Sequence, residues 1–528
     1  MLRSMVTLNA NLNCKCVSMP KNVWPMSANW CQYSTQLSPQ LVPNEKFNAF
    51  VAQMNAEKRM ANRYLLIEDK CNSLAKLNAH NLSQLLDTRV NHIHRWSFNQ
   101  NSCALVELNE DNYYLRRDIR RNFGCDDSRR SQLTVKTNGL KFITLKTCPR
   151  LSPNKTNSGN NDVIREMTTR RRDASYLNTN YLRQIMKTNE ELLSYLVYGK
   201  HFDVLDLKLR FYIISQLEQY ICHTFFKNHQ ILPFGSSIAG LGTPNSDLDL
   251  VLVPNKLSED QLSREGDRQR LTTNLNLIAD LLQHSVPYYS HFSRILKARI
   301  PIIKFGFELA PIDIDLSIEI SPHSVHSGVY MSAYLNHCIL LHPCVRDLIL
   351  LLRVWAKQHK LLKPKNWSTH IVYNGFTSFQ LTALVIYFLQ KQEIVPPMRQ
   401  FLSHTSDRFI LSRRDVSTLE LLSEFLEFVL SLRCEWEAIS ILDGTTFPNP
   451  EPHLPIWMQN PFQTELNMCR NITPVKFDKF LEITHLSSEI MKTKAFNLVD
   501  IFDKDLHMNS YANGSKTSRI DVENLFID

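Results

Sequence analysis

Residues 233–253, PFGSSIAGLGTPNSDLDLVLV, carry the pattern that decides the fold of this chain. An apolar run leads into Gly235 and Ser236, and a second apolar run contains Asp247 and Asp249. A glycine lets the backbone approach a ligand closely, and a serine that caps a following helix exposes its hydroxyl and N–H groups to a phosphate. We therefore expect a phosphate-binding turn, a helix capped by Ser236, and a strand that holds two carboxylates.

The spacing of the two acids favours metal binding. Side chains two residues apart in a strand point to the same face, so Asp247 and Asp249 would present both carboxylates to one place. Mg²⁺ prefers hard oxygen ligands, and a two-metal site needs carboxylates that hold ions about 3.5–4 Å apart. An isolated pair of this kind is more often the solvated face of an edge strand, so the interpretation depends on a third acid.

A third carboxylate comes from residues 312–320, IDIDLSIEI, which alternate apolar and polar side chains and predict a strand. If this strand lies beside the one that carries Asp249, either Asp313 or Asp315 completes the metal site and takes a proton from an attacking hydroxyl. The alternation does not choose between these two acids.

The composition sets the wider limits. A chain of 528 residues is too long for one compact core and predicts two or three domains with tails. The formal net charge of +9 favours anionic partners. No apolar run approaches the length of a membrane span, so we expect a soluble protein without a membrane partner.

The first half of the chain contains three further segments. Residues 1–44 have no Asp or Glu and are rich in Ser, Asn and Met, which is the bias of an organellar transit peptide; a disordered tail is the alternative. Residues 60–147 predict the order βαββαβ, as in RNA-recognition (RRM-like) domains, but the third strand lacks the aromatic side chains that bind RNA. Residues 148–172 predict a linker. The predicted strands are 64–67, 92–98, 103–108 and 142–145, and the predicted helices are 74–86 and 113–123.

These motifs resemble a known family. The Gly-Ser pair, Asp-Leu-Asp-Leu at 247–250, Pro-Ile-Ile-Lys-Phe at 301–305 and Asp-Leu-Ser at 315–317 are similar to the polymerase β-type nucleotidyltransferase core of poly(A) polymerases and terminal uridylyltransferases, and most of all to mitochondrial poly(A) polymerases. The resemblance covers about residues 175–490. In that family a hydrophobic and a small polar residue follow the third catalytic Asp, which favours Asp315.

The resemblance implies an α+β multidomain fold. It implies a polymerase β-like nucleotidyltransferase palm with a mixed sheet, followed by a mostly helical domain and preceded by the RRM-like domain, through which the family forms dimers. The implied segments are the palm at 173–325, the helical PAP-associated domain at 326–495 and a tail at 496–528.

The resemblance also implies nucleotide-binding residues. Arg353 and Lys357 stand where the family binds the triphosphate, and many relatives have Lys at the position of Arg353. Ser378 matches a phosphate contact and Phe379 the aromatic that stacks on the base, although Phe379 would also fit a buried helical face. Ser332 matches a sugar contact.

Residues 456–471 are similar to the family's nucleotide-recognition loop. Asn460 and Gln463 could read the base. Leu466 stands where uridylyltransferases tend to have His, and a hydrophobic side chain there favours ATP.

The resemblance thus predicts template-independent transfer of AMP from ATP to the 3′-hydroxyl of single-stranded RNA, with two Mg²⁺ or Mn²⁺ ions held by Asp247, Asp249 and Asp315. It predicts a mitochondrial (matrix) protein, the cytoplasm being the alternative, and a homodimer through residues 60–147. Arginines between residues 116 and 130 and in the linker are expected to contact RNA phosphates. A terminal uridylyltransferase shares every catalytic residue and is the first alternative. A catalytically silent RNA-binding scaffold is the second.

Overall fold

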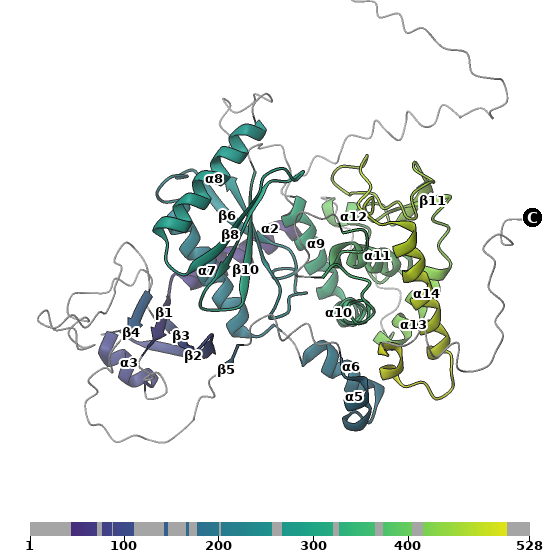
Figure 1. Cartoon of the computed structure of the whole chain (residues 1–528), viewed down its shortest axis with the longest axis horizontal. Helices are drawn as coiled ribbons and strands as arrows, with labels where there is room; N and C mark the ends of the chain where they lie inside the picture. Colours follow the sequence, from purple (N-terminus) through teal and green to yellow (C-terminus); the bar gives the residue numbers. More distant parts are fainter. Residues whose placement is uncertain are drawn as a thin grey trace, which may run out of the picture. The chain divides into compact units, whose positions relative to one another are not determined.

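The chain is described by a computed structural model (Figure 1). None of the described helices is long and apolar enough to cross a membrane. The predicted transit peptide up to residue 43, the predicted helix at 113–123 and the arginines between 116 and 130 lie outside the described residues. The described residues are 44–70, 77–86, 88–109, 142–145, 165–167, 177–199, 202–255, 267–319, 327–364, 373–403 and 415–503.

A five-stranded mixed sheet forms the centre of the palm, in the order β6-β7-β10-β9-β8 (Figure 1). The neighbours β7 and β10 are parallel, and the other pairs are antiparallel. The strands predicted around Asp249 and at 312–320 are therefore confirmed, and they are direct neighbours. The strands are β6 (His229–Phe234), β7 (Leu248–Pro254), β8 (Tyr289–Ile295), β9 (Ile302–Phe307) and β10 (Ile312–Ile318).

Alternation along β7 and β10 separates two faces of the sheet, one of which carries the acids. Leu248 and Leu250 are buried in one core with Ile314 and Leu316, and this core also holds the apolar residues of α7 (Val204–Ile221) and α8 (Asp267–Ser285). The intervening residues, which include Asp249 and Asp315, point to the opposite face because a strand has a period of two. The two helices pack on the face opposite the acids, and Asp249 and Asp315 are half-buried.

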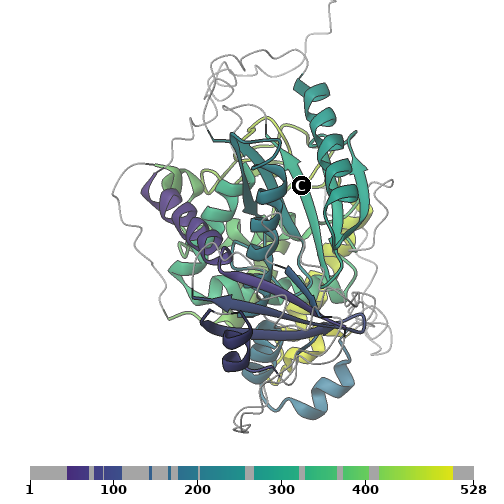
Figure 2. The same ribbon diagram turned by 90° about the vertical axis from the view of Figure 1, so that its left-hand side faces the viewer.

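The second half of the described chain is mostly helical (Figure 2). Its apolar residues share one core. Its helix α11 is buried almost all round, because it lies at the centre of this core. The elements are α9 (Ser327–Leu341), α10 (Pro343–Gln358), α11 (Ser378–Lys391), α12 (Met398–Leu402), α13 (Thr418–Leu430), the hairpin β11 (Glu437–Ser440) and β12 (Thr445–Pro448), α14 (Pro474–Met491) and the 3₁₀ helix η3 (Leu498–Phe502).

Three features differ from the expected boundaries. Helices α5 (Thr179–Ile185) and α6 (Asn189–Tyr198) were expected in the palm, but their apolar residues pack into the helical core. The expected tail at 496–528 begins with η3, whose apolar side chains are buried. Helix α2 (Glu45–Ala61) was not predicted, since its apolar residues are sparse; it packs through Phe47, whose ring stacks on Tyr330 at 3.8 Å. In each case burial against distant residues decides the assignment.

The N-terminal sheet has the order β4-β1-β3-β2-β5, and the RRM-like prediction is not confirmed. In a βαββαβ sheet each helical crossover joins two parallel strands, the first to the second and the third to the fourth. The second and third strands form an antiparallel hairpin, so the fourth strand runs antiparallel to the first. Here β4 runs parallel to β1. A fifth strand from the predicted linker adds to the other edge, beside β2. The elements are β1 (Tyr64–Asp69), α3 (Ala79–Leu86), β2 (Val90–Phe98), β3 (Asn101–Leu108), β4 (Phe142–Leu145) and β5 (Arg165–Glu166).

One face of this sheet is buried against the palm. Cys103 and Leu105 of β3 share a core with palm residues, whereas Ala104 and Val106 pack with α3. Trp96 of β2 donates from its indole Nε1 to the Leu309 carbonyl oxygen at 2.7 Å. Among the described residues the central strand of this sheet therefore offers no open platform for stacked bases.

Candidate active site

The turn after β6 is shaped around a single glycine. Gly235 has φ +78°, and a Cβ at this position would lie 2.2 Å from Oδ2 of Asp249. Its N–H donates to Oγ of Ser332 at 2.8 Å. Only glycine fits, because both the left-handed backbone and the close approach of the carboxylate exclude a side chain.

Ser236 lies in this turn, but it does not cap a helix, and that prediction was wrong. The amides of Ile238 and Ala239 both donate to the Gly235 carbonyl oxygen, and the chain then continues as turns. Ser236 is half-buried at the start of the turn.

The sheet register brings two of the predicted acids together. Asp315 on β10 is paired with Asp249 on β7, and Asp249 is in turn paired with Phe234 at the end of β6. Asp247 immediately precedes β7. Asp313 lies opposite Gly306 on β9. The alternation in the sequence did not show whether Asp313 or Asp315 is the third acid of the site. The parallel register makes Asp315 the direct neighbour of Asp249.

Lys304 lies beside Asp315 on the next strand, so Asp249, Asp315 and Lys304 form a row of charged side chains across the sheet. The sequence reasoning assigned Lys304 no role in the site. It is paired with Asp315 across β9 and β10, and its Nζ lies 2.8 Å from Oδ2 of Asp315. Burial lowers the pKa of Lys304, but the ion pair and hydrogen bond with Asp315, together with the charges of Asp247 and Asp249, outweigh burial and raise it overall. The signal was present, since Lys304 occupies a polar position in an otherwise apolar strand.

The chemistry of the acids fits a divalent cation. Asp247, Asp249 and Asp315 offer carboxylate oxygens, the ligand type that Mg²⁺ and Mn²⁺ prefer. Within the part of the chain that the structure describes, no three His, Cys, Asp or Glu side chains are arranged as a ready metal cage.

Arg353 of α10 holds the end of the turn that follows Gly235 through hydrogen bonds and does not project into solvent. Its Nη1 donates to the Leu241 carbonyl oxygen at 3.1 Å, and its Nε and Nη2 donate to Oγ1 of Thr382 at 3.1 and 2.9 Å. Burial lowers the pKa of Arg353 to about 10, so the group still carries its charge at neutral pH. Lys357, one turn further along α10, is exposed.

Ser378 and Phe379 begin α11. Thr377 caps this helix in a capping box with Gln380, which leaves Ser378 and Phe379 exposed in the first turn. Phe379 is 42% exposed, so the alternative of a buried Phe379 is wrong. A helix N-terminus with a free-standing aromatic side chain suits a phosphate and a base.

The loop 456–471 uses much of its polar chemistry on its own structure. Oδ1 of Asn460 accepts from the amides of Phe462 at 2.9 Å and Gln463 at 3.1 Å. Oε1 of Gln463 accepts from Arg299, which precedes β9 and which the sequence reasoning had not singled out. Leu466 is half-buried. The carbonyl oxygens of both predicted base readers are therefore engaged within the protein.

Ser332 on α9 is 2% exposed. Its Oγ accepts from the Gly235 amide and donates to the Gly328 carbonyl oxygen at 2.7 Å. The hydroxyl thus acts as both acceptor and donor within the protein and holds the turn, whereas a sugar contact had been expected.

A mixed sheet with adjacent acids on parallel strands and a glycine turn packed on one of them is the arrangement of a polymerase β-like palm. Residues 193–334 match the family model described as "Poly(A) RNA polymerase, mitochondrial-like, central palm domain". The chain is similar to the mitochondrial poly(A) RNA polymerase of Drosophila melanogaster, with 29% identity over 54% of this chain and 50% of that protein. It is also similar to the Homo sapiens protein of that name, with 26% identity over 58% of this chain and 59% of that protein. The match thus spans only half to three fifths of the length of these relatives.

Solved structures establish the fold. The crystal structure of mtPAP in complex with ATPgammaS matches with a TM-score of 0.68 and 22% identity, over 86% of this chain and 99% of that chain. The structure of mtPAP in complex with UTP matches with a TM-score of 0.69 and 21% identity, over the same shares. The chain therefore has the predicted α+β architecture with a polymerase β-like palm and an additional helical part.

Proposed function

We propose that this protein transfers AMP from ATP to the 3′-hydroxyl of single-stranded RNA without a template. The observation that carries the proposal is the register of β7 and β10, which makes Asp249 and Asp315 neighbours beside the turn at Gly235. The family of the relatives supports RNA polyadenylation as the reaction.

In this proposal Asp247, Asp249 and Asp315 hold two Mg²⁺ or Mn²⁺ ions. When bound, such ions lower the pKa of the attacking hydroxyl and neutralise charge on the phosphates. Asp315 also lies where it can accept the proton of the RNA 3′-hydroxyl. Gly235 keeps the backbone close to Asp249, so that the reacting phosphate meets main chain rather than a side chain.

The remaining residues bind the nucleotide. Arg353 is fixed beside the turn and supplies positive charge there. Lys357 and Ser378 bind triphosphate oxygens. Phe379 stacks on the base, since it is exposed at the start of α11. Ser236 offers its hydroxyl and amide to a phosphate. We assign Ser332 to holding Gly235, because its hydroxyl is already used there.

Adenine is the proposed base because Leu466 is apolar and leaves a purine room without demanding a hydrogen bond. Asn460 and Gln463 contribute through their amide nitrogens, since their carbonyl oxygens are engaged.

The test is extension of a labelled single-stranded RNA primer by the full chain, with each of the four nucleoside triphosphates in turn and with Mg²⁺ or Mn²⁺. We expect ATP to give the highest kcat/KM, and Asp249→Asn to abolish extension. Better extension with UTP would make the protein a uridylyltransferase. No extension with any nucleotide by the folded protein would support a silent RNA-binding scaffold.

We also propose a mitochondrial location and a homodimer through the N-terminal sheet, both on the strength of the relatives. A fluorescent fusion of the full chain should colocalise with a mitochondrial marker. Light scattering on the purified chain should give twice the mass of one chain. A diffuse cytoplasmic signal or a monomer mass would contradict the respective proposal.

A further inference from the structure

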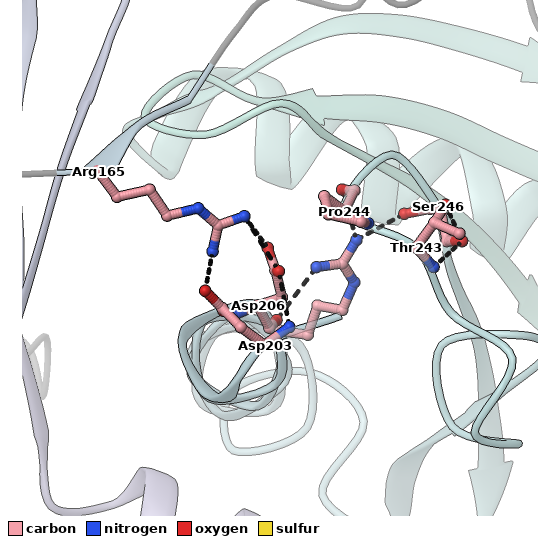
Figure 3. Close-up of polar contacts among 7 residues, drawn as sticks. Arg165, Asp203, Asp206, Thr243, Pro244 and Ser246 are labelled. Atoms are coloured by element: carbon pink, nitrogen blue, oxygen red, sulfur yellow. Dashed lines mark hydrogen bonds and ion pairs between the residues drawn. The ribbon is translucent and has the colours of Figure 1, made fainter. Parts of the chain in front are cut away.

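The loop that leads into Asp247 is held by a completely buried guanidinium. Arg210 on α7 is 0% exposed. Its Nη2 donates to the carbonyl oxygens of Ser246 at 2.7 Å and Pro244 at 3.3 Å (Figure 3). Ser246 immediately precedes Asp247, so Arg210 fixes the peptide plane from which the acid projects.

The surroundings of Arg210 are built for this contact. Its Nη1 donates to the Asp206 carbonyl oxygen at 3.1 Å, and its Cζ lies 4.5 Å from the centre of the Phe202 ring. Burying a charge is costly unless it is fully paired, and an apolar side chain of similar volume would avoid that cost. The advantage of an arginine here is its rigid fork of donors, because Nη1 binds the Asp206 carbonyl oxygen of α7 while Nη2 binds the two carbonyl oxygens of the loop.

A second contact holds the other side of Asp247. Oγ of Ser237, in the turn that follows Gly235, donates to the Asp247 carbonyl oxygen at 2.8 Å. The carbonyl groups before and after the Cα of Asp247 are therefore both fixed, one by α7 and one by the phosphate turn. A displaced loop would move the carboxylate relative to Asp249, which the sheet holds independently.

The N-terminal sheet reaches the same loop through α7. Arg165 on β5 pairs with Asp203 at 2.5 Å and with Asp206 at 3.1 Å (Figure 3). These two acids form the capping box that starts α7, and the Asp206 carbonyl oxygen is the one that binds Arg210. A continuous series of polar contacts thus runs from β5 to the residue before Asp247.

We propose that Arg210 and Ser237 are positioning residues for Asp247, and that Arg165 couples the N-terminal sheet to this position through the start of α7. The inference rests on the proposed function for its activity readout alone. A change at β5, such as one that follows binding of RNA or of a second chain to the N-terminal sheet, would reach the active site through one turn of helix.

Hydrogen–deuterium exchange of the full chain without nucleotide tests the positioning, with peptides that cover residues 241–249. Arg210→Lys keeps the charge but loses the fork, and Ser237→Ala removes the second contact. We expect amide exchange in this loop to rise about tenfold in Arg210→Lys and less in Ser237→Ala. In primer extension, kcat should fall about tenfold to a hundredfold while KM for ATP stays within about twofold, because a displaced acid affects chemistry more than binding.

Unchanged exchange in the loop together with an unchanged kcat in both variants would overturn the assignment. If Arg210→Lys does not fold, Ser237→Ala and the Arg165 variant below decide the question. The exchange measurement is independent of the reaction, so a wild-type chain that extends no primer would refute the proposed function and leave the positioning testable.

The coupling has a matched control. Arg165→Ala removes a 31% exposed side chain that pairs with two aspartates. Arg183→Ala removes a 33% exposed side chain that also pairs with two aspartates, Asp500 and Asp503, in the C-terminal segment. We expect only Arg165→Ala to raise exchange in residues 241–249, with kcat about threefold lower. Equal effects of the two variants on the loop and on kcat would overturn the coupling.

Discussion

The acid row of the palm and the loop 456–471 are both assigned to the active site, yet they are built in opposite ways. Asp249, Asp315 and Lys304 lie on neighbouring strands whose main chains are held by ladder hydrogen bonds, so their side chains are not needed to hold the main chain. The loop has only isolated β-bridges in the described structure, Met458 with Ile439 and Gln459 with Asn467, and its polar side chains hold the loop itself. In the proposed function, the palm would therefore fix the reaction, whereas the loop would influence which base is accepted.

The largest effect should come from the row. Asp315→Ala should lower kcat for primer extension by about a thousandfold, because it removes both a metal ligand and a proton acceptor. Asp313→Ala, two residues away on the same strand, should change kcat less than about threefold. Loss of activity in Asp313→Ala with retention in Asp315→Ala would show that the register of β7 and β10 differs from the one described.

Gly235→Ala should come next, with a loss of about a hundredfold in kcat, since the added Cβ would displace the Asp249 carboxylate. Gly240→Ala is the matched control. It also has a left-handed backbone, with φ +84°, but its nearest contact would be Ile339 at 3.6 Å. We expect it to cost roughly 1 kcal/mol of stability without a comparable loss in kcat. Similar losses in both variants would mean that backbone strain alone is responsible.

On the base-binding side, Phe379→Ala should raise KM for ATP about tenfold with a smaller change in kcat, as expected for one lost stacking contact. The side chain is 42% exposed, so the melting temperature should not change. Phe379→Tyr should restore KM. A large fall in melting temperature, with KM unchanged, would show that Phe379 serves the fold instead.

Lys304→Met tests whether the row needs a cation when no metal is bound. In EDTA we expect a loss of about 1–2 kcal/mol, a value reduced because a third of the Lys304 side chain is exposed. Mg²⁺ should stabilise the variant more than the wild type. The folded pKa of Lys304 is raised above its usual 10.5, so the stability that the pair contributes is fully present below that pH and is lost as pH rises through the folded value.

The difference in unfolding free energy between wild type and Lys304→Met should therefore be constant from about pH 6 to pH 9. Denaturant unfolding at several pH values measures it. A difference that disappears within this range would contradict the described ion pair.

The smallest effect should be Leu466→His, which should shift the ratio of kcat/KM for UTP over ATP by about three- to tenfold toward UTP. Arg299→Ala releases the Oε1 atom of Gln463 and makes the companion variant. If neither variant changes the ratio of UTP to ATP use, base selection lies outside the loop.

Much of the palm could be predicted from the sequence because its strands alternate strictly. Period-two patterns at 248–253 and 312–320 gave the strands and the shared face of their acids. The N-terminal sheet was less predictable: its first three strands were found, but the direction of β4 depends on pairing between residues distant in the chain, which local patterns do not encode. Helix α2 was not predicted for the same reason, since it packs on α7 and α9, which are distant in the chain.

The residues of the candidate site fall into the same two groups, those that local sequence patterns predict and those that depend on distant partners. Gly235, Asp247 and Asp249 are close in the chain and could be assigned together from their spacing, and the resemblance added Asp315 and Phe379. Lys304, Arg210 and Arg299 were not found, because each acts through a partner that is distant in sequence. Ser332 and Asn460 were found. The Ser332 hydroxyl and the side-chain carbonyl of Asn460, which were expected to contact the nucleotide, already form hydrogen bonds within the protein.

The sequence by itself determined the acids, the glycine turn and the faces of the strands, because these follow from backbone periods and residue chemistry that act over a few positions. The tertiary structure alone decided that Asp315 lies beside Asp249, that Lys304 faces it, and that a buried arginine on α7 holds the loop before Asp247. Such choices depend on sheet register and on the burial of charge. Both are set only when segments far apart in the chain pack together.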